Sequence, residues 1–179
     1  MRRLRYQVAS SLDAYIAGAN GEFDWIVRDP EIDFGELFNQ FDTAVMGRRT
    51  FEVILKQGGN GSMAGLDVVV FSQTLQQKDF PAVLIVNTDP AEAIRTLKAK
   101  AGKDIWLYGG GELFRTLLDA GLVDTVEPAI IPVMLGGGVP LLPATANRTQ
   151  LTLIRHRLYQ QSGIMLLEYA VKRLKEADS

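Results

Sequence analysis

The chain alternates between short apolar runs and segments whose apolar residues recur every three or four positions. The runs Asp67–Phe71, Val83–Val86 and Ile105–Leu107 have the length of buried strands. Leucine and phenylalanine residues between Leu113 and Leu118 have the spacing of one helix face, and Gly121 follows as a stop signal. Because a helix between two strands carries the chain back across a sheet, this alternation predicts a mostly parallel sheet flanked by helices.

The first third of the chain predicts a strand, a long loop and a short helix. Leu4–Ser10 is the strand, and Ser11–Pro30 is rich in turn residues, which is typical of a loop. A loop of this length in a compact domain is often functional. Asp33 stands close to the start of the helix, whose apolar face would consist of Phe34, Leu37, Phe38 and Phe41.

The middle of the chain continues the alternation. Thr43–Met46 predicts a strand, and helical spacing resumes after Gly47. Further on, Asp89, Pro90 and Glu92 provide a cap, a proline at the first helical position and an acid in the first turn. A helix is therefore predicted to begin at this point.

The last third reads as strands joined by turns. Val123–Ile131 is extended, and Pro128 within it predicts an edge strand or a bulge because proline lacks a ladder N–H group. Leu151–Gln160 and Ile164–Val171 predict a terminal antiparallel hairpin, and Leu135–Pro140 a glycine-rich loop before it. The expected sheet is therefore mostly parallel and completed by antiparallel strands.

Composition limits the classes of function. The 179 residues suit one domain, 1–179, and 19 basic against 21 acidic side chains give a net charge of −2, which argues against a broad nucleic-acid or membrane surface. The absence of cysteine excludes disulfides and thiolate catalysis, and the single His156 leaves little for a metal site. Without an apolar leader at the N-terminus or a long apolar segment, the expected location is the cytoplasm.

Two predicted strand-to-helix junctions carry the residues expected of a phosphate site. They are Met46–Thr50, with the sequence MGRRT, and Tyr108–Phe114, with the sequence YGGGELF. The first N–H groups of a helix lack intrahelical partners, and glycine lets an anion approach them. Arg48 and Arg49 suit the 2′-phosphate that distinguishes NADP from NAD, although no GxGxxG fingerprint follows the first strand. The residues thus favour NADPH as a cofactor.

Six motifs in order give a more specific interpretation. They are SLDAYIA, MGRRT, VVFSQT, YGGGELF, GLVDTV and PVMLGGGVPLL. Together they resemble the dihydrofolate reductase-like fold, especially the reductase domain of the bacterial riboflavin-pathway deaminase-reductase and its stand-alone relatives. The resemblance spans almost the whole chain and implies a three-layer α/β/α domain. The zinc pattern of the deaminase half is absent, so a reductase module alone is expected.

The resemblance also implies a set of cofactor-binding positions. The MGRRT junction would bind the pyrophosphate and 2′-phosphate, the residues after Phe71 would border the adenine ribose, and the triple glycine would let the cofactor pass closely. The first strand and its following loop would line the nicotinamide. The residues assigned in this way are Ala9, Ile16, Ala17, Gly47, Arg48, Arg49, Thr50, Ser72, Gln73 or Thr74, Tyr108, Gly109, Gly110, Gly111, Glu112 and Leu113.

Two carboxylates are candidates for contact with the substrate. Asp33 stands roughly where dihydrofolate reductases have the acid that pairs with the pterin ring, and Asp13 belongs to the SLD motif. Their alternative roles are structural: Asp33 as an ordinary helix cap, and Asp13 as a partner of its own loop backbone. Family members commonly have glycine where this chain has Ala14.

The predicted function is an NADPH-dependent reductase that resembles 5-amino-6-(5-phosphoribosylamino)uracil reductase of riboflavin biosynthesis. Two alternatives stay open: a dihydrofolate or related pterin reductase, and a non-catalytic NADP-binding dimeric module. The expected substrate is a small heterocycle, either a pterin or a ribosylaminopyrimidine. The family often forms homodimers through the sheet edge and C-terminal strands, with which the apolar run Ile164–Leu167 is compatible.

Overall fold

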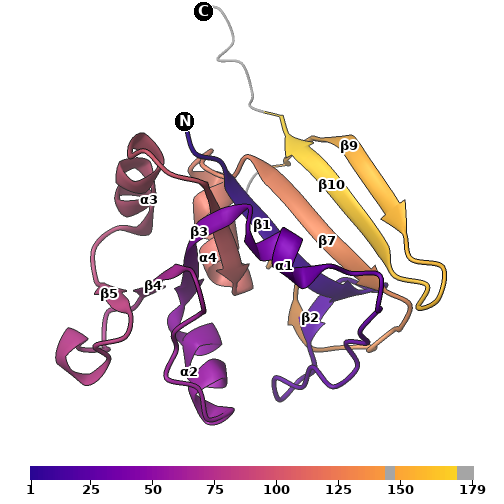
Figure 1. Ribbon diagram of the computed structural model, residues 1–179, viewed down its shortest axis with the longest axis horizontal. Helices are drawn as coiled ribbons and strands as arrows, with labels where there is room; N and C mark the ends of the chain where they lie inside the picture. The colour runs from indigo at the N-terminus through magenta and orange to yellow at the C-terminus, as the bar shows by residue number, and fades with distance from the viewer. Residues whose placement is uncertain (144–147, 173–179) are drawn as a thin grey trace, which may run out of the picture.

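An eight-stranded sheet forms the centre of the structure, a computed structural model that describes residues 1–143 and 148–172. The strand order is β5-β4-β3-β6-β1-β7-β10-β9. Pairing is parallel from β5 to β7, whereas β10 is antiparallel to both of its neighbours. Figure 1 shows the hairpin of β9 and β10 at one end of the sheet and β5 at the other. The predicted combination of parallel and antiparallel strands is confirmed.

The boundaries of the elements agree closely with the predicted segments. The strands of the main sheet are β1 (Leu4–Ser11), β3 (Phe41–Gly47), β4 (Asp67–Phe71), β5 (Leu84–Val86), β6 (Asp104–Gly109), β7 (Thr125–Ile131), β9 (Leu151–Leu158) and β10 (Met165–Val171). The helices are α1 (Phe34–Phe38), α2 (Arg48–Lys56), α3 (Pro90–Ala99), α4 (Gly111–Asp119) and the short 3-10 turn η1 (Gln77–Asp79). A separate pair of short strands consists of β2 (Tyr15–Ala17) and β8 (Val139–Pro140).

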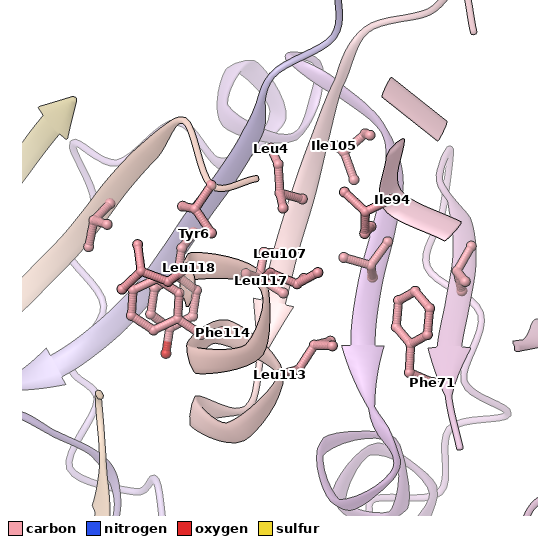
Figure 2. Packing of buried hydrophobic residues seen from close by; sticks show 14 residues of the cluster. Leu4, Tyr6, Phe71, Ile94, Ile105, Leu107, Leu113, Phe114, Leu117 and Leu118 are labelled. Carbon is pink, nitrogen blue, oxygen red and sulfur yellow. The ribbon is translucent and has the colours of Figure 1, made fainter. Parts of the chain in front are cut away.

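One face of the sheet packs against α3 and α4. The rings of Tyr6 on β1 and Phe114 on α4 stack with their centroids 3.8 Å apart. Leu107 and Leu117 are fully buried in the same cluster, and Ile94 brings α3 into it (Figure 2). Because side chains alternate along a strand, only every second residue of β1 and β6 reaches this layer.

The opposite face packs against α1 and α2. Trp106 on β6 stacks on Phe38 of α1 and on Phe41 of β3, with centroid distances of 5.2 and 5.7 Å. Phe51 of α2 is fully buried against Met46 and other residues of the sheet. With helices on both faces the domain has the three-layer arrangement of the dihydrofolate reductase-like fold, as predicted.

The predicted helix signals are present in the structure. Asp89 accepts a hydrogen bond from the Ala91 N–H group at the start of α3, and Pro90 is its first residue. Asp33 caps α1 by accepting from the N–H group of Glu36, 2.9 Å away. These caps satisfy donors that have no intrahelical partner.

The prediction that Phe41 belongs to the first helix is wrong. The helix α1 ends at Phe38, and Phe41 begins β3, where its backbone pairs with Asp104. Its side chain is nevertheless buried, against Trp106. The apolar residue therefore had the spacing of a helix face but reaches the core from a strand.

The prediction about Pro128 is also corrected. Pro128 lies neither on an edge strand nor at a bulge of its own strand, because β7 stands between β1 and β10. The β7 partners of β10 are Thr125, Val126, Ala129 and Ile130, so the pairing passes over Pro128 and its missing N–H group. In the run Ile164–Leu167, Ile164 is buried and the other three residues are half-buried. The edge strand next to β10 is β9, which is exposed along its length, and a homodimer stays a prediction.

Within the described residues, no helix is long and apolar enough to cross a membrane.

Candidate functional site

A cleft of about 1290 Å³ opens at the carboxyl ends of the parallel strands β3, β4 and β6 and extends along the sheet toward α1. In α/β sheets, ligands bind outside the carboxyl ends of the strands. Every residue predicted to contact the cofactor lines this cleft. The cleft thus brings together groups that are separated along the chain by more than half of its length.

Two helix N-termini meet at one end of the cleft. The helices α2 and α4 begin after Gly47 and Gly110, and neither start has a side-chain cap. A Cβ atom added to Gly47 would lie 4.0 Å from Cβ of Leu113, and one added to Gly110 would lie 3.2 Å from Oγ1 of Thr50. The two helix starts are therefore adjacent, and their first N–H groups are available to an anion.

Two arginines stand at the start of α2. Both are exposed. Arg48 Nη1 donates to Thr74 Oγ1 at 2.8 Å, and Arg48 Nε lies 3.0 Å from a carboxylate oxygen of Glu52. Arg49 forms no ion pair or side-chain hydrogen bond with any residue in the described ranges. One guanidinium is therefore held in place beside the loop after β4, and the other is free to bind an external anion.

The loop after β4 is ordered by a buried serine. Ser72 Oγ accepts hydrogen bonds from the N–H groups of Thr74 and Leu75, at 3.2 and 3.0 Å. Gln73 and Thr74 remain exposed at the cleft, and the amide of Gln73 donates to the carbonyl of Asn87. This loop thus places the Thr74 hydroxyl against the guanidinium of Arg48.

The triple glycine lets three parts of the chain approach closely. Gly109 has a φ of 151°, in the region that favours glycine, and the Gly109–Gly110 peptide is cis. A Cβ atom on Gly111 would lie 2.9 Å from the carbonyl oxygen of Pro140 on β8. Since β8 pairs with β2, the glycines bring the helix start next to the wall that contains Ile16 and Ala17. Ala9 of β1 completes this wall of small and aliphatic side chains.

The other end of the cleft is apolar and largely aromatic. Trp106 and Tyr108 of β6 meet edge to face, with centroids 4.9 Å apart, and burial raises the pKa of the Tyr108 hydroxyl. The sequence prediction did not identify most of this surface, because its residues alternate with core residues and have the same apolar character. The further lining residues here are Phe23, Ile26, Val27, Ile32, Phe34, Leu37, Phe38, Tyr159, Ile164 and Leu166.

The family model of the RibD C-terminal domain matches residues 2–165. The chain belongs to the RibD C-terminal domain family. It is 36% identical to protein YyaP of Bacillus subtilis, over an alignment that covers 94% of each chain.

Solved structures agree with this family. A protein from Shewanella sp. PV-4 named for riboflavin biosynthesis has a TM-score of 0.81 and 28% identity, over 97% of this chain and all of that one. Dihydrofolate reductase of Enterococcus faecalis, solved with NADP(H), has a TM-score of 0.70 and 18% identity, over 96% of this chain and 97% of the other. The second likeness shows that the RibD C-terminal domain shares the dihydrofolate reductase-like fold.

In this member of the RibD C-terminal domain family, the two candidate carboxylates do not line the cleft. Asp13 accepts hydrogen bonds from the Ser11 hydroxyl at 2.6 Å and from the N–H groups of Leu135 and Gly136 at 3.1 and 2.7 Å. The Ser11 bond, more than any other contact, lowers the pKa of Asp13. Asp33 serves as the cap of α1. Both residues thus have a structural role in this chain, and their catalytic role stays a prediction.

The loop that holds Asp13 includes Ala14, at the position where the resemblance leads one to expect glycine. Ala14 adopts a φ of 66°, a conformation that glycine reaches without strain and other residues adopt less readily. Alanine therefore adopts this turn at a cost that glycine would not incur.

Carboxylates and metal-binding groups are scarce around the cleft. Among the described residues that line the cleft, Glu112 is the one carboxylate, and it pairs with Arg115 at 2.9 Å. The described residues contain no group of three or more side chains able to hold a metal ion.

Proposed function

We propose that this protein is an NADPH-dependent reductase acting on a small planar heterocycle, of the pyrimidine class used in riboflavin biosynthesis. One observation carries the proposal: a single cleft contains an anion-binding end, with two uncapped helix starts and two arginines, and an aromatic end. Its volume of about 1290 Å³ leaves room for a dinucleotide whose nicotinamide adjoins a second, flat ligand. Membership of the RibD C-terminal domain family supports the pyrimidine class.

The residues present fit the cofactor. The glycines at 47, 110 and 111 leave room where a Cβ atom would approach Leu113, Thr50 or the Pro140 carbonyl, so backbone N–H groups are accessible to phosphate oxygens. Arg48 and Arg49 add positive charge at the same end. In the related fold of Enterococcus faecalis dihydrofolate reductase, the solved complex contains NADP(H).

Bound NADPH would supply a hydride, and the work of the protein is therefore placement and exclusion of water. Ala9, Ile16 and Ala17 would hold the nicotinamide against β1. The aromatic end would bring the substrate ring to it in a fixed orientation, which lowers the entropic barrier of the reaction. Tyr108 is protonated at neutral pH, since burial raises its pKa further above the ordinary value of about 10, and its hydroxyl can donate a hydrogen bond to the substrate.

The experiment is to follow NADPH absorbance with purified protein and two substrates, 5-amino-6-(5-phosphoribosylamino)uracil and dihydrofolate. Oxidation that depends on the pyrimidine supports the proposal, and oxidation with dihydrofolate alone indicates a pterin reductase. NADPH binding without oxidation by either substrate contradicts catalysis and favours the non-catalytic module.

A further inference from the structure

Gln7 on β1 has a buried oxygen with no partner. Gln7 is 8% exposed. Within residues 1–143 and 148–172, its Oε1 atom is the one buried side-chain nitrogen or oxygen that lacks a hydrogen-bond partner. Gln7 is also among the residues that line the cleft. Buried polar atoms are almost always paired, so an unpaired acceptor at a binding cleft is available to a donor group of a ligand.

The orientation of this amide follows from its neighbour Glu127. Glu127 receives two hydrogen bonds of 2.7 Å from the guanidinium of Arg5, and the Thr125 hydroxyl donates to it at 2.5 Å. The Gln7 amide nitrogen lies 3.3 Å from the same carboxylate. A carboxylate in a two-point ion pair offers only acceptors, so the nitrogen must face it and Oε1 must be the atom left over. The usual ambiguity of an amide flip does not arise here.

The position of Gln7 relates it to the aromatic end of the cleft. Side chains two residues apart on a strand share a face, and Ala9, beside Gln7 on that face, lines the cleft as well. In the sheet, Gln7 and Ala9 pair with Glu127 and Ala129. The indole N–H of Trp106 donates to the backbone carbonyl of Gln7 at 3.0 Å, which fixes β1 beside the aromatic wall.

We propose that Gln7 Oε1 is a specificity determinant that accepts a hydrogen bond from an N–H group of a neutral, planar nitrogen heterocycle. The inference rests on the proposed function, because a hydrogen bond from the substrate ring to Gln7 would be one means by which the reductase site selects its substrate. The Glu127 carboxylate polarises the amide from behind, which strengthens the acceptor and disfavours an anionic group at this position. A ring with an unblocked N–H group satisfies the orphaned oxygen, and a ring whose nitrogens are all alkylated leaves it unpaired.

The test is calorimetric titration of the full chain, saturated with NADP, using two probes. The first, 5,6-diaminouracil, has several N–H donors, and the second, 1,3-dimethyluracil, has none. The wild-type protein is expected to bind the first at least about fivefold more tightly, as one hydrogen bond allows. Gln7→Met keeps a side chain of similar length without the acceptor and is expected to lose at least about fivefold in affinity for 5,6-diaminouracil. Gln160→Met, at an exposed position outside the cleft, should retain the wild-type preference.

Two further measurements separate possible failures. Gln7→Met should have a melting temperature close to that of the wild type, because it removes both an unpaired buried acceptor and the 3.3 Å hydrogen bond to Glu127, and it should bind NADPH normally. An unchanged probe preference in Gln7→Met, or no preference or binding by the wild type, overturns the inference about Gln7. Failure of the proposed function is seen separately, as absence of NADPH binding or oxidation in the wild type. The wild-type comparison needs no variant and decides the matter even if Gln7→Met does not fold.

Discussion

Replacing Arg48 by alanine should weaken NADPH binding far more than NADH binding. The guanidinium is held between Thr74 Oγ1 at 2.8 Å and Glu52 at 3.0 Å, beside the loop that would border the adenine ribose. A hydrogen bond to a charged group contributes about 1.5–3 kcal/mol, which corresponds to about a 10- to 150-fold loss of affinity. NADH lacks the 2′-phosphate, so its already weaker binding should change little.

Replacing Glu52, the acid paired with Arg48, should change NADPH affinity in the opposite direction. Glu52 lies four residues after Arg48 on an exposed face of α2, and such pairs contribute about 0.3–0.5 kcal/mol. Glu52→Gln releases Arg48 from this competitor and should tighten NADPH binding about twofold. Arg155→Ala on β9, outside the cleft, removes the same charge as Arg48→Ala and should leave both affinities unchanged.

The assay is isothermal titration of each variant with NADPH and NADH at one fixed, low ionic strength, because salt screens such contacts. An equal loss for both cofactors in Arg48→Ala would show that Arg48 acts on the pyrophosphate or on folding and not on the 2′-phosphate. No loss for either would remove Arg48 from the site.

Two further predictions concern stability. Phe114→Ala deletes a ring that is 2% exposed and stacked on the Tyr6 ring at a centroid distance of 3.8 Å. It should lower the free energy of unfolding, measured by denaturant titration, by about 3–5 kcal/mol, and a loss below about 1 kcal/mol would contradict the packing described. Asp13 has a lowered pKa in the folded state, so its ionised form stabilises the fold above the ordinary aspartate pKa of about 4, and this stability is lost as the pH falls through the lowered value. Asp13→Asn should therefore be less stable than the wild type near neutral pH, and its melting temperature should fall less than that of the wild type when the pH drops below about 4. Parallel curves of melting temperature against pH for the two proteins would refute the role of the Ser11 and Gly136 contacts.

Local sequence signals predicted most of the fold. Asp89 and Pro90 identify the start of α3 because capping depends on residues that are adjacent in sequence. The position of Pro128 could not be read in the same way. Whether a strand is central depends on which distant strand pairs with it, and here β10, about forty residues later, passes over the proline. The prediction assigned Phe41 to the first helix because it lies three residues after Phe38, but a buried strand residue is apolar as well, and Phe41 begins β3.

The candidate site was predictable at its phosphate end and not at its substrate end. Glycine and arginine at strand-to-helix junctions have a local physical meaning, so the residues near Gly47 and Gly110 could be named in advance. The orphaned oxygen of Gln7 arises only because Arg5 and Glu127, on two strands, form an ion pair behind it. Such a constraint is a property of the folded arrangement and leaves no pattern along the chain.

The most direct test of the central claim is a calorimetric titration of the wild-type protein with NADPH, NADH and ATP. The account predicts that NADPH binds at least tenfold more tightly than NADH, a difference of about 1.4 kcal/mol, and more tightly than ATP, which lacks the nicotinamide half. Equal affinity for NADPH and NADH would contradict the 2′-phosphate site at Arg48 and Arg49. No binding of any of the three would contradict the reductase proposal itself.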